Sequence, residues 1–132
     1  MDAAELATIP FFAALSVEEC ERLAPCAKRT VVPAGLAITV MGERGDEFFV
    51  IEEGRAYVSQ DAARLAELGP GDFFGEVALV DPEWRTASVI AATAMHLIVL
   101  TEGSCGALLR DNPQLADRLS IAARERLAQS GY

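Results

Sequence analysis

The sequence predicts a mostly β fold with flanking helices: N-terminal helices in residues 1–27, an antiparallel β-roll in residues 28–100 and a C-terminal helix pair in residues 101–132. Three observations indicate this order. Helix-capping signals precede residue 28. Short β-rich runs then alternate with Gly, Pro and Asp, as in a sandwich or small barrel. Apolar residues at helical spacing return near the end of the chain. The length suits a single domain over residues 1–132.

Two capping signals define the N-terminal helices. Asp2 with Glu5 has the spacing of a capping box, which predicts a short helix that stops before residue 10. Ser16 with Glu19 repeats that spacing and opens a second helix that runs to about Ala24.

The middle of the chain carries the β signal, because runs rich in β-branched and aromatic residues are bounded by turn residues. We expect strands at Arg29–Val32, Leu36–Met41, Glu47–Glu52, Arg55–Gln60, Ala63–Leu68, Thr86–Ala91 and Met95–Leu100. We expect turns at Pro33–Gly35, Gly42–Gly45, Glu53–Gly54, Asp61–Ala62 and Gly69–Asp72.

The last part of the chain is predicted to be helical. A short helix should end at Asp111, and Asn112 then has the character of an N-cap before a last helix at Pro113–Gln129. The apolar stripe of this helix has two interpretations: ordinary core packing on the roll, or a lid or dimer seam that moves when a ligand binds.

Composition limits the function. A net charge of −9 disfavours a nucleic-acid surface and adsorption to anionic lipid. With no long apolar run and no leader, we expect a cytoplasmic protein that does not enter a membrane. Cys20, Cys26 and Cys105 form no C-x-x-C pair, and His96 is alone, so we expect free thiols and no metal site. No catalytic set is arranged locally, and an enzyme is not expected.

Residues 74–88, F-G-E-V-A-L-V-D-P-E-W-R-T-A-S, are the most informative stretch. Gly75 permits a tight turn that exposes N–H groups, and Glu76 can accept hydrogen bonds from hydroxyls. Arg85 offers a fork of donors to an anion, and Thr86 adds a hydroxyl. Together they suit a ligand with one phosphate and one sugar hydroxyl. The alternative is that Glu76 and Arg85 form a structural ion pair.

These residues resemble the cyclic nucleotide-binding domain family, the sensor fold of catabolite-activator regulators, cyclic-nucleotide-dependent kinases and gated channels. F-G-E-x-A-L followed by R-T-A resembles the family's phosphate-binding cassette. Further matches are Gly35, G-E-x-G-D at Gly42–Asp46, the run ending at Gly54, and L-x-P-G-D-F-F-G-E at Leu68–Glu76. The resemblance extends from Phe11 to about Ser130. It implies an antiparallel double-stranded β-helix, which is a jelly-roll-like β-roll.

The resemblance also implies residue roles. Arg85 would pair with the cyclic phosphate, Glu76 would accept from the ribose 2′-hydroxyl, Val58 and Leu65 would flank the base, and Ser130 would present a hydroxyl to it. Backbone N–H groups after the glycine and after Thr86 would point at the sugar phosphate. The ligand-binding residues implied in this way are Phe74, Gly75, Glu76, Val77, Ala78, Arg85, Thr86, Ala87, Val58, Leu65 and Ser130.

The expected function is therefore a regulatory domain that binds cyclic AMP, with cyclic GMP as a second candidate because Thr86 can serve either. Binding would move the C-terminal helix, and no other cofactor is expected. The expected partners are a second copy of the chain or an effector domain. Two alternatives stay open: a non-sensing scaffold or dimerisation module, and a regulatory fragment of a larger transcription factor, transporter or acyltransferase.

Overall fold

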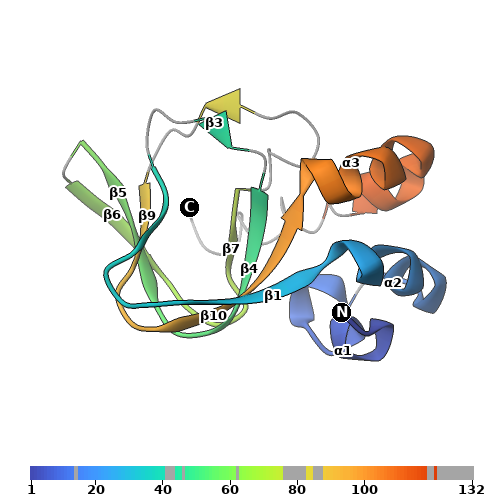
Figure 1. Ribbon diagram of the computed structural model, residues 1–132, viewed down its shortest axis with the longest axis horizontal. Helices are drawn as coiled ribbons and strands as arrows, with labels where there is room; N and C mark the ends of the chain where they lie inside the picture. Colours follow the sequence, from blue (N-terminus) through green and yellow to red (C-terminus); the bar gives the residue numbers. More distant parts are fainter. Residues whose placement is uncertain are drawn as a thin grey trace.

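The computed structural model describes residues 1–13, 15–40, 44–45, 47–61, 63–75, 83–84, 88–118 and 121. Over these residues, two four-stranded antiparallel sheets face each other, with strand orders β1-β10-β4-β7 and β2-β9-β5-β6. Helices from both ends of the chain gather on the side of the first sheet that faces away from the second (Figure 1). The predicted mostly β fold with flanking helices is therefore confirmed.

Every predicted strand is present with bounds within two residues of the prediction, and there are three short additions; Met41, Thr86 and Ala87 of the predicted strands lie outside the described residues. The strands are β1 (Lys28–Val32), β2 (Ala37–Thr39), β3 (Arg44–Gly45), β4 (Glu47–Glu53), β5 (Ala56–Gln60), β6 (Ala63–Leu68), β7 (Phe73–Phe74), β8 (Glu83–Trp84), β9 (Ser88–Ala91) and β10 (Met95–Thr101). The additions are β3, β7 and β8. β3 pairs with β8 in a separate two-stranded sheet, so Arg44 and Gly45 do not belong to the turn predicted there.

The N-terminal helices confirm one capping box and correct the other. Ser16 Oγ accepts from the Glu19 N–H at 3.1 Å, and Glu19 Oε1 accepts from the Ser16 N–H at 2.9 Å. Asp2 caps its helix through the Ala4 N–H at 2.8 Å, whereas the Glu5 carboxylate is engaged by a distant arginine. The helical segments are α1 (Ala3–Ala7), η1 (Pro10–Phe12), α2 (Val17–Leu23) and η2 (Ala24–Cys26).

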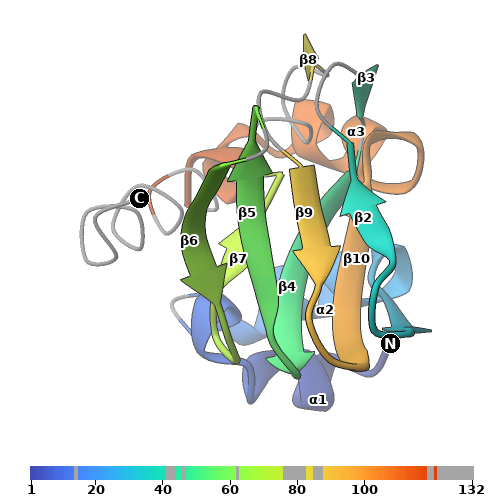
Figure 2. The ribbon, with the colours of Figure 1, turned by 90° about the vertical axis from the view of Figure 1, so that its left-hand side faces the viewer.

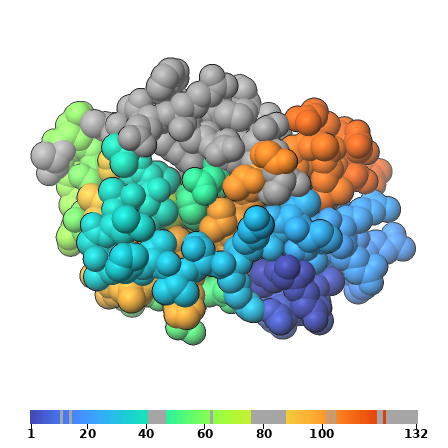
Figure 3. Space-filling model, in the orientation of Figure 1, coloured from blue at the N-terminus to red at the C-terminus, as the bar shows by residue number. Residues whose placement is uncertain are grey.

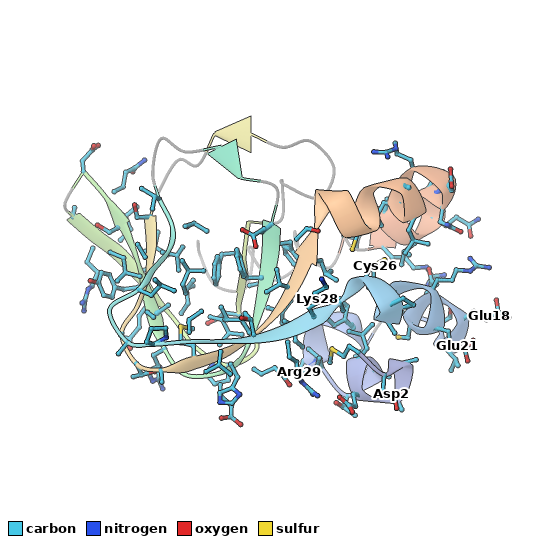
Figure 4. The ribbon with its side chains drawn as sticks, viewed as in Figure 1. Asp2, Glu18, Glu21, Cys26, Lys28 and Arg29 are labelled. Carbon is cyan, nitrogen blue, oxygen red and sulfur yellow. The ribbon has the colours of Figure 1, made fainter. Side chains whose placement is uncertain are left out.

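That arginine is Arg29 on β1, which lies beside α1 (Figure 4). Its Nε donates to Glu52 Oε1 at 2.9 Å, and Nη1 donates to Glu5. The hydrogen bond to Glu52 is the main reason that the pKa of Arg29 is raised. Charge-assisted bonds explain why Glu5 contacts Arg29 instead of the backbone of Asp2.

The first sheet is the central layer because its two middle strands, β4 and β10, are largely apolar on both faces. Alternate residues of β4 and β10 point to opposite sides. Residues that pack with the helices include Phe48, Val50, Ile98 and Leu100. Residues that pack between the two sheets include Phe49, Ile51, Met95 and Leu97.

The C-terminal helical region confirms the break predicted after Asp111. Helix α3 (Glu102–Asp111) leads through Asn112 to a second helical stretch over residues 113–118. Most of the last helix predicted at Pro113–Gln129 lies outside the described residues.

No helix of the part described is long and apolar enough to cross a membrane. The cysteines are free, with Cys20 and Cys105 buried and Cys26 half-buried.

Candidate functional site

Strand β7 holds the start of the predicted cassette, because Phe74 is both the last residue of β7 and the first residue of the cassette. Phe73 lies in the core beneath the helices, with its ring centroid 5.9 Å from that of Phe48. Phe74 lies in the core between the sheets and stacks on Phe49 at 4.8 Å. Two adjacent aromatic side chains therefore anchor opposite faces of the same short strand, and each ring pair stabilises the fold beyond its buried area.

The turn before β7 fixes its direction. Asp72 Oδ2 accepts from the Gly69 N–H at 2.8 Å, and the Asp72 carbonyl accepts from the Ile51 N–H at 2.9 Å. The Ile51 carbonyl in turn accepts from the Gly71 N–H at 2.9 Å. These bonds tie the turn to the middle of β4.

Gly75, the second residue of the cassette, directly follows β7. Its φ of +79° lies in the left-handed region, which L side chains rarely adopt. Glycine suits this position for that reason, whereas the exposed N–H groups predicted to follow it lie outside the described residues.

The two residues predicted to flank a base differ in environment. Val58 is fully buried between the sheets, whereas Leu65 is 53% exposed. Val58 pairs with Ala66, but the next pair is Ser59 with Arg64, so Leu65 is the extra residue of a β-bulge. Leu65 thus offers an exposed apolar side chain, and the base-flanking role of both residues stays a prediction.

The chain is also held by hydrogen bonds directly after the cassette, at Val89. Val89, at the start of β9, pairs with Val58 on one side and with Thr39 on the other. Its N–H donates to the buried Thr39 hydroxyl at 3.2 Å. Sequence reasoning did not single out Thr39. A hydroxyl inside the otherwise apolar run A-I-T-V was the available signal.

Other predicted ligand contacts lie outside the described residues, and their roles stay predictions. They are Glu76, Val77, Ala78, Arg85, Thr86, Ala87 and Ser130. His96 is an exposed β10 residue whose Nε2 lies 3.9 Å from Glu53 Oε2. Within the part of the chain that the structure describes, no three His, Cys, Asp or Glu side chains are grouped as metal ligands.

A polar groove of about 620 Å³ separates α2 from the start of the last helical stretch. Arg118 Nε lies 3.3 Å from Glu19 Oε2 across it, and Arg22 Nη1 donates to Asn112 Oδ1 at 3.1 Å. Asn112 Nδ2 also donates to the Leu108 carbonyl at 2.8 Å. The Asn112 side chain therefore joins α2 to α3, while its backbone carbonyl accepts from the Leu115 and Ala116 N–H groups of the helical stretch that follows. Figure 3 shows these N- and C-terminal helices in contact at one end of the molecule.

Comparison with known proteins identifies the family. The sequence profile of the cyclic nucleotide-binding domain matches residues 29–112, which include the cassette and both of its anchored ends. The chain belongs to the cyclic nucleotide-binding domain family. Members of this family are regulatory domains that are generally not catalytic.

Three relatives illustrate the match. A cyclic nucleotide-gated potassium channel of Mesorhizobium japonicum is 36% identical over 121 residues, covering 92% of this chain and 34% of the channel. The Thermus thermophilus catabolite activator protein is 29% identical with a TM-score of 0.74, covering 92% of this chain and 60% of that one. The regulatory domain of Toxoplasma gondii PKA, co-crystallised with cAMP, is 27% identical with a TM-score of 0.75, covering 93% and 48%. The chain therefore spans about a third of the channel that it resembles.

Proposed function

We propose that this chain binds a cyclic nucleotide, with cyclic AMP favoured over cyclic GMP, and transmits binding through its C-terminal helix. The family match across the cassette carries the proposal. The rigid flanks support it, since Phe73 and Phe74 anchor one end and Val89 is bonded at the other. A site held at both ends loses less conformational entropy when a ligand orders it.

In this proposal Arg85 meets the phosphate charge. The chain carries a net charge of −9, so a phosphate needs a local cation to offset the overall repulsion. Arg85 would pair with the equatorial oxygens, while N–H groups of Val77, Ala78 and Ala87 would donate to the sugar phosphate. Glu76 would accept from the ribose 2′-hydroxyl.

The proposed output is the helix that follows Asn112. Asn112 lies at the joint between α3 and this helix, and its side chain contacts Arg22 and the Leu108 carbonyl. Glu19 and Arg118 add a second link to α2. A ligand can shift such a joint only by its different affinity for the two arrangements. Slower amide hydrogen exchange in residues 113–132 upon binding would support this coupling; unchanged exchange in a ligand-saturated protein would contradict it.

Calorimetry with cyclic AMP, cyclic GMP and 5′-AMP tests binding itself. We expect the cyclic esters to bind more tightly than 5′-AMP. Arg85→Ala should weaken cyclic AMP binding by about 2–5 kcal/mol, because it leaves a buried phosphate charge unpaired. Arg55→Ala is the matched control. The Arg55 side chain is 61% exposed, and its ion pair with Glu67 is long, with 3.7 Å between Nη1 and Oε1. No heat with any nucleotide would favour the non-sensing scaffold, and equal losses in the two variants would refute the role of Arg85.

A further inference from the structure

Strand β6 is the longest open edge of the two four-stranded sheets. In the part of the chain that the structure describes, the edge strands are β1 and β7 in the first sheet and β2 and β6 in the second. β6 spans six residues, whereas β1 spans five, β2 three and β7 two. Figure 2 shows β6 as the outermost strand beside β5. An edge strand presents N–H and C=O groups that can pair with another strand.

The side chains of β6 are mostly open to solvent. Four of the six are exposed, namely Ala63, Arg64, Leu65 and Glu67. Arg64 and Glu67 make the strand locally neutral in a chain whose net charge is −9. β1, by contrast, carries Lys28 and Arg29, and like charges of this kind discourage pairing at an edge. β6 is therefore the edge best suited to a partner strand.

The two charges of β6 lie on the same face of the sheet. Glu67 pairs with Tyr57 and Arg64 pairs with Ser59, and these two β5 residues are half-buried and alternate with buried ones. The bulge at Leu65 adds one residue between the charges, which keeps both on the outer face. The Arg64 guanidinium lies 4.0 Å from the centre of the Tyr57 ring, and this contact holds it over that face.

The β6 sequence A-R-L-A-E-L is complementary to itself in the antiparallel direction. A two-fold axis between residues 65 and 66, perpendicular to the sheet, sets Arg64 of each copy opposite Glu67 of the other. Leu65 then lies opposite Ala66. Opposite charges directly across a ladder attract, with Cβ atoms about 4.5–5.5 Å apart. In-register pairing of β1 with itself instead sets both of its charges opposite valines.

We propose that two copies of this chain associate through β6, in an antiparallel pair that joins their second sheets into one continuous sheet. Backbone hydrogen bonds, two Arg64–Glu67 ion pairs and the Leu65 contacts hold the pair together. An interface one strand wide is smaller than that of a permanent dimer, so the association is weak and reversible. The net charge of −9 on each copy opposes it at long range. This inference does not depend on the proposed nucleotide binding.

Sedimentation equilibrium without nucleotide measures the dimer Kd, at about 10 μM to 1 mM protein. An ionic strength of about 0.15 M screens charges beyond about 8 Å. Arg64→Glu and Glu67→Arg each set like charges opposite one another, and each should weaken the dimer at least about tenfold. Glu67→Arg adds two positive units to a chain of net charge −9, which lowers the overall repulsion. A tighter dimer in Glu67→Arg would therefore overturn the proposal.

A mixture of the two variants tests the register. In a mixed pair, the two carboxylates of the Arg64→Glu protein face the two arginines of the Glu67→Arg protein. The mixture should dimerise about as well as the unmodified chain, although neither variant does so alone. The double variant Arg64→Glu with Glu67→Arg exchanges the two charges and should recover the Kd to within about threefold. Absence of association in the mixture would overturn the proposed pairing.

Lys28→Glu is the matched control. It makes the same charge change as Arg64→Glu at an exposed position of β1, which belongs to the other sheet. It should leave the dimer Kd unchanged, and urea unfolding should show all variants folded. Equal weakening by Lys28→Glu and Arg64→Glu would overturn the role of β6. An unmodified chain that stays monomeric up to about 1 mM would overturn this inference alone, whereas a failure to bind nucleotide would overturn only the proposed function.

Discussion

Gly54 gives a sharp test of the packing between the β4–β5 turn and the β9–β10 turn, each of which connects one sheet to the other. Gly54 has a φ of +95°, and a Cβ there would lie 2.5 Å from the Ala94 carbonyl oxygen and 2.9 Å from Met95 Cα. Both atoms belong to backbone, so a side-chain rotation cannot relieve the contact. The Thr93 hydroxyl also accepts from the Arg55 N–H at 3.0 Å, which holds the two turns together.

We expect Gly54→Ala to destabilise the fold by about 2–4 kcal/mol. A left-handed L residue costs about 1–2 kcal/mol, and forcing apart a well-packed contact costs about 1–3 kcal/mol. The reduced freedom of the unfolded chain returns about 0.4–1 kcal/mol. Gly35→Ala is the matched control. Its φ is +89°, but a Cβ there would meet nothing within 4 Å, so it should lose about 1 kcal/mol.

Urea unfolding followed by circular dichroism measures both variants. The midpoint should fall much further for Gly54→Ala than for Gly35→Ala, with similar slopes. Equal midpoints would show that the two turns can separate without cost, and the clash argument would be wrong.

Two further predictions concern the helical end of the molecule. A double-mutant cycle of Glu19→Gln with Arg118→Ala should give a coupling of only about 0.5–1 kcal/mol, because the Arg118 side chain is 51% exposed; strictly additive urea midpoints would contradict the link. Thiol titration of the native protein should modify Cys26 first, since Cys20 and Cys105 are buried and burial, followed by the charge of Glu19, raises the pKa of Cys20. Early modification of Cys20, identified by mass spectrometry, would argue against this packing.

The main strands were predictable because their signal is local. Short β-rich runs between Gly, Pro and Asp turns predicted Ala63–Leu68 with the observed bounds, and Glu47–Glu52 to within one residue. The capping box of Ser16 and Glu19 was predictable for the same reason, since both bonds lie within one helical turn.

The short strands were not predictable from their own residues. β7 contains only Phe73 and Phe74, and it is a strand because Val50 and Phe49 pair with it across the sheet. β3 and β8 likewise exist only as partners of each other. A two-residue segment has no periodicity that a sequence pattern could detect.

The features of the candidate site likewise divide into those that the sequence predicted and those that it did not. The motif at residues 74–88 was sufficient to predict the family to which the chain belongs, whereas its role in binding a phosphate stays a prediction. Three other features depend on residues distant in the chain. They are the β-bulge at Leu65, the hydrogen bond from the Val89 N–H to Thr39, and the contacts of Asn112 with three helical segments. Residue type and spacing report contacts within a few positions along the backbone. Which side chains complete a ladder or a helix joint is decided only when burial brings distant strands and helices together.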